Sequence, residues 1–488
     1  MGNTSRLSTG IAGLDTILDG GFLEEQNVII RGPPGAGKTI FGLHFLAAGG
    51  NDEVSLYINL GEPTEYVRRT ADHFGLNSDS LRFLELSPTG DRFTEEGTYT
   101  LFSSAEAEQP SLVSEVRETV EELQPDRVLI DPITEFRFMT TDDHQFRTQI
   151  LGLLDFLKSA NATVVMTSQA AADVSDTDLQ FLTDAVINLE QTEDTHTVDV
   201  PKFRGPSAKR GPHAYEITEA GVEVWPRLEI RETQTDFPQE KLSSGVPELD
   251  QLLNGGLDRG TVTFFSGPTG VGKTTTSMQF VQAAAGRGTQ SLLLSFEESR
   301  RTLIQRSEAL NMPISEMVEQ GTLDIIEVRP QEYTVNQLTN MLQEAVEDAG
   351  VEIVLVDGTQ GFKQNLRGHG DDPAKNLIDI GRYLREMGVT TIVTNEVHDI
   401  TGQFRATEEG VSNLADNIVF IRHVEYKGRI QKVIGVLKMR TSDFEHTLRR
   451  LEFTEHGISV GDPLEELQGV LTGTPEWKDE ESAGGTDG

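Results

Sequence analysis

Two short glycine-rich stretches have the residue types and spacing of a phosphate-binding loop. Residues 32–39 and residues 267–274 both match the pattern G-x-x-x-x-G-K-[ST]. In such a loop the glycines let the backbone curl so that its N–H groups face phosphate oxygens. The lysine adds a positive charge near the outer phosphates, and the threonine hydroxyl can hold Mg²⁺. The candidate nucleotide-binding residues are Gly32, Gly35, Gly37, Lys38 and Thr39 in the first stretch and Gly267, Gly270, Gly272, Lys273 and Thr274 in the second.

A carboxylate for the metal is expected at the end of a buried strand in each half. Asp131 follows the apolar run "RVLI", and Asp357 follows "IVLV". In P-loop enzymes an aspartate at this place supports the metal, so both aspartates join Thr39 and Thr274 as candidate Mg²⁺ ligands. ATP and Mg²⁺ are therefore the expected cofactors. The alternative is a carboxylate that only closes a turn after the strand.

The elements that would position these residues alternate between strand-like and helix-like patterns. Each glycine loop follows a short β-rich run, "QNVIIRG" or "VTFFSG". The runs that end at the two aspartates are continuously apolar, as in strands buried on both faces of a parallel sheet. This alternation predicts an α/β fold in which a mostly parallel, twisted sheet in each half is flanked by helices on both sides.

The chain contains this plan twice. "GIAGLDTILDGGF" at residues 10–22 matches "GVPELDQLLNGGL" at residues 245–257, and the loop lysines are separated by the same number of residues. A repeat of this length is a duplicated domain. We predict a first domain at residues 1–229, a linker at residues 230–240, a second domain at residues 241–462, and a C-terminal loop with an acidic, disordered tail at residues 463–488.

Composition excludes several classes of protein. The 488 residues include no cysteine, which excludes disulfides, thiolate metal sites and cysteine nucleophiles and favours a reducing, cytoplasmic location. No stretch of about 18 or more uncharged apolar residues is present, so no membrane span is expected. The formal net charge of −38 disfavours strong binding to a nucleic-acid backbone, and we hypothesise that it reflects a salt-rich cytoplasm.

With these motifs in place, the chain resembles the KaiC family over about residues 6–475. The resemblance is carried by the paired domain openings, by "KFRGPSAKRGPHAYEIT" and "LKMRTSD", and by the late "GVLTGTPEW". It implies two tandem RecA-like P-loop domains that assemble into a two-tiered homohexamer, with ATP bound between neighbouring subunits. It also implies that the first domain is chiefly an ATPase and that the second also phosphorylates hydroxyl groups near its own ATP site.

The resemblance also implies catalytic carboxylates. "SFEES" supplies Glu297 and Glu298, which match the family's paired glutamates and can orient or deprotonate the attacking water or hydroxyl. The matching strand of the first half, "YINLGEP", has Gly61 and Glu62 instead. Aligned on the strands, Glu62 corresponds to Glu298 and a glycine replaces Glu297. Counted from the loop lysines, Glu62 would instead correspond to Glu297, but the loops before the two strands differ in length, so we prefer the strand alignment. One carboxylate remains in either alignment, and hydrolysis by the first domain stays open.

Two basic pairs complete the catalytic set that the resemblance implies. Lys202 and Arg204 alternate along one predicted strand, and Lys438 and Arg440 along another, so the members of each pair face the same side. In the family the matching pair reaches the γ-phosphate of the neighbouring subunit. A charge supplied in trans stabilises the transferring phosphoryl group and makes catalysis depend on assembly. The alternative is a solvated basic face of the strand.

The stretch "ATEEGVSNLADNIV" occupies the place of the family's phosphoacceptor segment. Anchored on Asp416, Ser412 matches the acceptor serine without gaps. Asn413 replaces the adjacent acceptor threonine, and Thr407 matches a nearby minor hydroxyl. Ser412 and Thr407 are therefore the candidate phosphoacceptors, against the alternative that Ser412 is an ordinary loop or capping serine.

These features predict a homohexameric, Mg²⁺- and ATP-dependent ATPase of KaiC type whose second domain is a serine/threonine autokinase. Its nucleotide and phosphorylation state would be presented to unidentified signalling or regulatory proteins. One alternative is a RecA-type DNA-dependent recombinase or helicase, which would need basic or aromatic loops facing a central channel. The other is an ATP-gated scaffold with little catalysis, for which Gly61 is the argument. The sequence itself shows no rhythmic, clock-like function.

Overall fold

The computed structural model describes residues 5–50, 52–86, 109–140, 142–169, 176–193, 195–205, 207–229, 237–366, 373–397, 413–426, 428–470 and 475–477. The chain divides into two compact units, Met1–Arg227 and Leu228–Gly488. Each unit is built around one nine-stranded sheet. Within the described stretches, no helix has the length and apolar character needed to cross a membrane.

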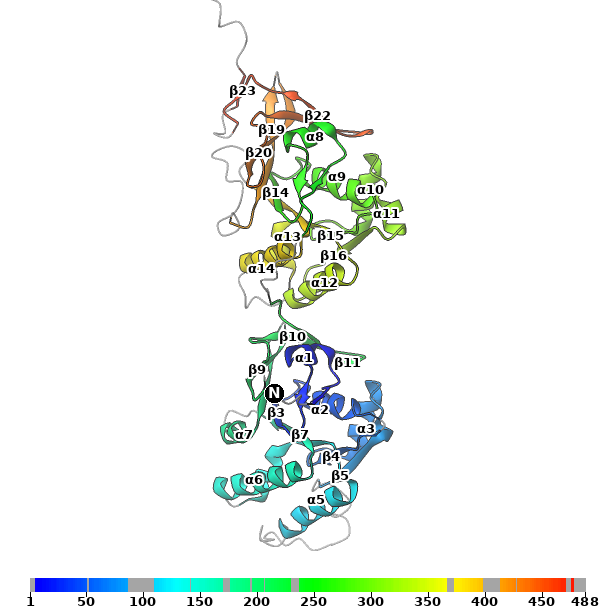
Figure 1. The fold of residues 1–488 in the computed structure, drawn as a ribbon, viewed down its shortest axis with the longest axis vertical. Helices are drawn as coiled ribbons and strands as arrows, with labels where there is room; N and C mark the ends of the chain where they lie inside the picture. Colours follow the sequence, from blue (N-terminus) through cyan, green and yellow to red (C-terminus); the bar gives the residue numbers. More distant parts are fainter. Residues whose placement is uncertain are drawn as a thin grey trace, which may run out of the picture. The chain divides into compact units, whose positions relative to one another are not determined.

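The sheet of the first unit is parallel over most of its width. In spatial order its strands are β11 (Gly221–Trp225), β10 (His213–Thr218), β9 (His196–Phe203), β8 (Ala185–Gln191), β3 (Asn27–Gly32), β7 (Thr163–Gln169), β6 (Arg127–Asp131), β4 (Ser55–Asn59) and β5 (Leu81–Glu85) (Figure 1). The strands from β8 to β5 are parallel, and β9, β10 and β11 continue the sheet in antiparallel pairing. The first glycine loop therefore leaves a strand in the middle of the sheet.

The second unit repeats this arrangement strand for strand. Its order is β22 (Gly457–Pro463), β21 (Arg449–Thr454), β20 (Arg429–Met439), β19 (Asn417–Tyr426), β14 (Val262–Gly267), β18 (Thr390–Glu396), β17 (Ile353–Asp357), β15 (Ser291–Ser295) and β16 (Leu323–Glu327). The strands from β19 to β16 are parallel, and β20 to β22 are antiparallel. The predicted α/β fold class is confirmed in both units.

Helices and short two-stranded sheets accompany the two large sheets. The helices are α1 (Ala12–Ile17), α2 (Lys38–Ala47), α3 (Thr64–His73), α5 (Gln109–Leu123), α6 (Asp143–Ser159), α7 (Thr177–Leu182), α8 (Pro247–Leu252), α9 (Lys273–Ala285), α10 (Arg300–Ala309), α11 (Ile314–Glu319), α12 (Val335–Glu347), α13 (Thr359–Asn365) and α14 (Pro373–Glu386). Two 3₁₀ turns are η1 (Ser78–Ser80) and η2 (Ile133–Met139). The two-stranded sheets pair β1 (Arg6–Leu7) with β2 (Phe22–Leu23), β12 (Lys241–Leu242) with β13 (Leu257–Asp258), and β23 (Leu467–Gln468) with β24 (Glu476–Trp477).

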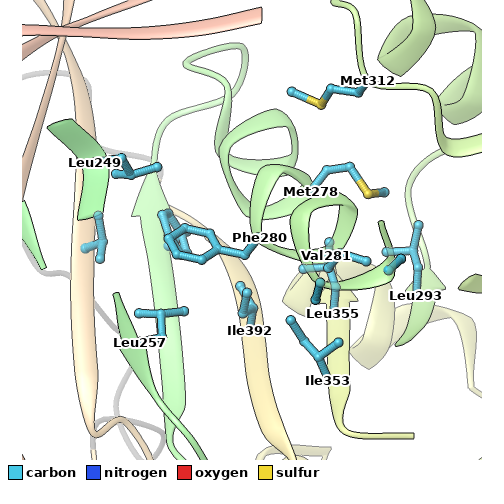
Figure 2. Packing of buried hydrophobic residues seen from close by; sticks show 14 of the residues in the cluster. Leu249, Leu257, Met278, Phe280, Val281, Leu293, Met312, Ile353, Leu355 and Ile392 are labelled. Carbon is cyan, nitrogen blue, oxygen red and sulfur yellow. The ribbon is translucent and has the colours of Figure 1, made fainter. Parts of the chain in front are cut away.

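Both faces of each sheet are buried. Successive side chains of a strand point to opposite faces, so one strand can contribute residues to two core clusters. In the second unit, Phe265 and Leu293 belong to the core cluster under α9, whereas Phe264 and Leu292 belong to the cluster under α12 and α14. Figure 2 shows the first of these clusters, which includes Met278, Phe280, Val281, Leu293, Ile353, Leu355 and Ile392. Each fully buried side chain of this kind contributes about 1.5–3 kcal/mol. The sheet is therefore a rigid base for the loops at the carboxyl ends of its parallel strands.

Candidate nucleotide-binding and catalytic sites

Both glycine loops connect the end of a central strand to the N-terminus of a buried helix. Gly37 and Gly272 precede α2 and α9 with φ of +83° and +102°, a left-handed backbone that favours glycine. A β-carbon on Gly272 would also lie 2.2 Å from Cζ of Phe453. The first N–H groups of each helix thus face the loop, where they can bind an anion. Of the other loop glycines, Gly32 and Gly267 end the strands. Gly35 and Gly270 also have a left-handed backbone.

The two loop lysines fold back onto their own loops. Nζ of Lys38 donates hydrogen bonds to the carbonyl oxygens of Gly32 at 3.0 Å and Pro33 at 2.9 Å. Nζ of Lys273 donates to the carbonyl oxygen of Pro268 at 3.1 Å. Burial lowers the pKa of both lysines, and nearby carboxylates oppose the shift. Each ammonium group therefore lies at the centre of its loop.

In the first unit the strand-ending aspartate contacts the loop threonine. Oγ1 of Thr39 donates to Oδ2 of Asp131 at 2.7 Å. The Tyr57 hydroxyl donates to the same oxygen at 2.6 Å, and Thr167 donates to Oδ1. Burial and the charge of Asp131 raise the pKa of Tyr57, so the phenol stays a hydrogen-bond donor. These contacts hold the carboxylate beside the loop.

The second unit has the same contact and an unused carboxylate oxygen. Oγ1 of Thr274 and Oγ1 of Thr394 both donate to Oδ1 of Asp357 at 2.8 Å. Oδ2 of Asp357 is buried and has no hydrogen-bond partner among the described residues. Burial raises the pKa of this carboxyl group. An unpaired carboxylate oxygen beside a hydroxyl is a donor set that suits Mg²⁺, which prefers oxygen ligands completed by phosphate and water.

The adjacent glutamates of the second unit lie in different surroundings. Glu298 forms a salt bridge with Arg306 of α10, and its carbonyl oxygen accepts a hydrogen bond from Ser295 at 2.7 Å. No hydrogen bond or salt bridge within the described residues holds the Glu297 carboxylate, which packs against Gly358. A β-carbon added to Gly358 would lie 2.7 Å from Cγ of Glu297. Burial and then the charge of Asp357 raise the pKa of Glu297.

Strand registers define the corresponding residues of the first unit. Asn59 stands opposite Asp131 in the sheet, as Ser295 stands opposite Asp357. Counting on from these positions, Glu62 takes the place of Glu298 and Gly61 that of Glu297. The side-chain amide of Asn59 donates to the carbonyl oxygen of Glu62 at 2.5 Å, as Ser295 does to that of Glu298. Thr70 stands where α10 has Arg306, so Glu62 lacks the salt-bridge partner that holds Glu298.

The basic pairs sit at the ends of β9 and β20. Nζ of Lys202 donates to the carbonyl oxygens of Gln180 at 2.7 Å and Thr183 at 2.5 Å, and Nζ of Lys438 donates to that of Ala415 at 2.6 Å. The arginines pair with aspartates: Arg204 with Asp184 at 2.9 Å and Arg440 with Asp416 at 3.6 Å. Within the described residues, none of these contacts reaches the glycine loop of the same unit.

These basic pairs differ from the prediction in one detail. The strands end at Phe203 and Met439, so Arg204 and Arg440 lie one residue beyond them. Backbone hydrogen bonding continues past the end of β9, because the backbone N–H of Arg204 donates to the carbonyl oxygen of Asp184 at 2.9 Å. The candidate phosphoacceptors Ser412 and Thr407 lie outside the described residues.

A groove of about 790 Å³ between α2 and α3 was not expected from the sequence. Tyr66 is 56% exposed there, and the Arg69 guanidinium carbon lies 5.5 Å from the centre of its ring. The groove is lined by Ile40, Glu62, Pro63, Tyr66, Arg69, Thr70, His73 and Phe74. The available signal was an aromatic and a basic residue one helical turn apart, directly after a candidate catalytic glutamate.

Fold and sites together define a chain of two tandem RecA-like P-loop units. A family model described as "ATPase: KaiC" matches residues 7–229 and again residues 242–465. The chain therefore belongs to the KaiC family of ATPases, which confirms the resemblance. Similar proteins include the "Circadian clock oscillator protein KaiC" of Prochlorococcus marinus (strain MIT 9313), which is 26% identical over 96% of this chain and 95% of the relative.

Two further relatives match over a similar span. The "Circadian clock protein KaiC3" of Synechocystis sp. is 25% identical over 96% of this chain and 94% of its own length. The "Circadian clock oscillator protein KaiC" of Synechococcus elongatus is 24% identical over 96% of this chain and 92% of its own length. The similarity therefore extends over nearly the whole length of this chain and of each relative.

Proposed function

We propose that each unit binds ATP with Mg²⁺ at its glycine loop and that the second unit also transfers phosphate to the chain itself. The observation that supports this most directly is repeated in both units. The loop threonine contacts the strand-ending aspartate, Thr39 with Asp131 and Thr274 with Asp357. A hydroxyl and a carboxylate beside an anion-binding loop are the groups that hold Mg²⁺ on a triphosphate.

The loop residues have distinct roles in this proposal. Lys38 and Lys273 release their carbonyl partners and bind the outer phosphates, while the N–H groups of the loop and helix bind the inner ones. Thr274 and the free Oδ2 of Asp357 hold the metal in the second unit. Bound Mg²⁺ neutralises charge on the β- and γ-phosphates.

In the second unit we assign the base to Glu297. Its carboxylate accepts the proton of the attacking water or serine hydroxyl while the new O–P bond forms. The bond from the γ-phosphorus to the bridging oxygen breaks, and that oxygen leaves with ADP. Oε1 of Glu298 forms a salt bridge with Arg306, so we assign Glu298 a role in orienting the neighbouring strand end.

The first unit lacks a carboxylate at the position of this base. Gly61 stands there, and only Glu62 remains of the glutamate pair. In this proposal the nucleobase would occupy the groove at Tyr66, whose exposed ring offers a stacking surface. We therefore propose slow hydrolysis in the first unit. Gly61 is also the observation that favours a second candidate function for this unit, an ATP-gated scaffold.

Assembly into a homohexamer with ATP at subunit boundaries is supported by the basic pairs. Lys202 and Lys438 make their polar contacts away from their own loops. The net charge of −38 argues against nucleic acid as the partner. We therefore propose unidentified signalling or regulatory proteins as the partners that bind the hexamer.

Autophosphorylation is proposed at Ser412, with Thr407 as the secondary acceptor. The test is phosphopeptide mapping after incubation of the full chain with Mg²⁺ and labelled ATP. We expect Ser412→Ala to remove most incorporated phosphate and Thr407→Ala, the matched control, to remove little. Phosphate mapped elsewhere would contradict the acceptor. ATP turnover without any phosphate on the chain would contradict the kinase and leave the ATPase.

A further inference from the structure

The second unit carries a carboxylate on its phosphate loop that the first unit lacks. β18 runs parallel to β14, and its last residue, Glu396, stands opposite Gly267 at the start of the loop. The Glu396 carboxylate accepts a hydrogen bond from the hydroxyl of Thr269, which lies within the loop. In the first unit Gln169 ends the matching strand and Pro34 replaces the threonine. Both the charge and the hydroxyl are therefore specific to the second unit.

Glu396 acts on the lysine that would meet the outer phosphates. Burial lowers the pKa of Lys273, and the negative charge of Glu396 opposes this shift most strongly, ahead of Glu297 and Asp357. For Lys38 of the first unit, the opposing charge comes from the metal-site aspartate. The hydrogen bond to Thr269 holds this carboxylate on the same loop that carries Lys273.

The γ-phosphate of ATP must share this space with the Glu396 carboxylate. Both are anions, and both would use the Lys273 ammonium group, which reaches the outer phosphates in loops of this type. ADP lacks the γ-phosphate and leaves the contact between Glu396 and Thr269 in place. We infer that Glu396 is a specificity-determining residue of the second site, which disfavours ATP relative to ADP. This inference rests on the proposed nucleotide binding by the second unit.

The test compares two nucleotides at one site of the full chain. A Lys38→Ala chain, in which the second loop keeps its lysine, is titrated calorimetrically with Mg²⁺–ADP and with a non-hydrolysable Mg²⁺–ATP analogue. Glu396→Gln should tighten binding of the analogue roughly tenfold, because a nearby like charge shifts an ionic equilibrium by about one pKa unit or more. Binding of ADP should change little. An unchanged ratio of the two affinities, or weaker binding of the analogue, would overturn the inference.

A reciprocal variant separates charge from a disturbed fold. Gln169→Glu in a Lys273→Ala chain places the same carboxylate at the first site, and should weaken the analogue more than ADP. A merely structural effect would weaken both nucleotides equally, which would count against the inference. If the Lys38→Ala chain binds neither nucleotide with Glu or Gln at position 396, the proposed function of the second unit is wrong as well.

Discussion

Replacing Glu297 with glutamine keeps the shape of the side chain and removes its ability to accept a proton. A general base contributes about 10²- to 10⁴-fold to the rate. We use the upper half of that range, because each neighbouring carboxylate already has one oxygen engaged: Oε1 of Glu298 with Arg306, and Oε1 of Glu396 with Thr269, although Oε2 of Glu298 has no partner among the described residues. We therefore expect turnover by the second unit to fall about 10³- to 10⁴-fold, which is about 4–5.5 kcal/mol at the transition state.

The assay is ATP turnover by a Lys38→Ala chain with and without Glu297→Gln, together with phosphate incorporation in a single turnover. Affinity for the ATP analogue should not fall, because Glu297 holds no hydrogen bond or salt bridge among the described residues and its replacement removes a negative charge that acts on Lys273. Glu298→Gln is the matched control, and its main effect should be lower thermal stability because Arg306 loses its partner. A loss of rate of less than about threefold would refute the assignment of Glu297 as the base, because removal of a general base has a much larger effect.

Glu297→Gln should make the folded chain more stable although it lowers the activity. Burial, and then the charge of Asp357, raise the pKa of Glu297 in the folded chain. The ionised side chain is therefore less favourable in the folded state than in the unfolded state, and this cost is present above both pKa values. Glu297→Gln should raise the melting temperature near pH 7–8, and the gain should vanish well below the ordinary glutamate pKa of about 4.3. A lower melting temperature at neutral pH would contradict this electrostatic account.

Other predictions follow from the same geometry. Gly61→Glu in a Lys273→Ala chain should raise ATP hydrolysis by the first unit at least about tenfold, because it restores the missing carboxylate. Its β-carbon would lie 3.1 Å from Cδ of Pro132, so only a small shift is needed, and no gain in rate would refute the assignment of this position. Arg440→Ala should slow turnover by the second unit about 10³-fold in assembled chains. Mixing Arg440→Ala and Glu297→Gln chains should then restore part of the activity, and no recovery would contradict action in trans.

The local parts of the site could be predicted from the sequence. The glycine loops and Asp357 are read from short motifs, because a loop between a buried strand and a helix needs particular residues at fixed spacing. The correspondence of Glu62 required a choice between two alignments, because the connections before β4 and β15 differ in length. The alignment on the strands pairs Glu62 with Glu298 and Gly61 with Glu297, and the strand registers give the same correspondence.

Contacts between distant residues were beyond the sequence argument. Arg306 reaches Glu298 from the following helix, and Glu396 reaches Thr269 from a strand 127 residues further along the chain. Such contacts depend on strand order, since β18 lies beside β14 only in the folded sheet. The groove at Tyr66 likewise arises from the packing of α3 against α2, which the helical pattern alone does not specify.

The most direct test of the account is the number of nucleotides that one chain binds. Equilibrium binding of a non-hydrolysable Mg²⁺–ATP analogue to the purified chain should give two sites per chain. Lys38→Ala and Lys273→Ala should each weaken one site and leave the other, because each removes the buried ammonium group of a single loop. No binding, or one site that only one of the two substitutions affects, would contradict the claim that both loops are nucleotide sites.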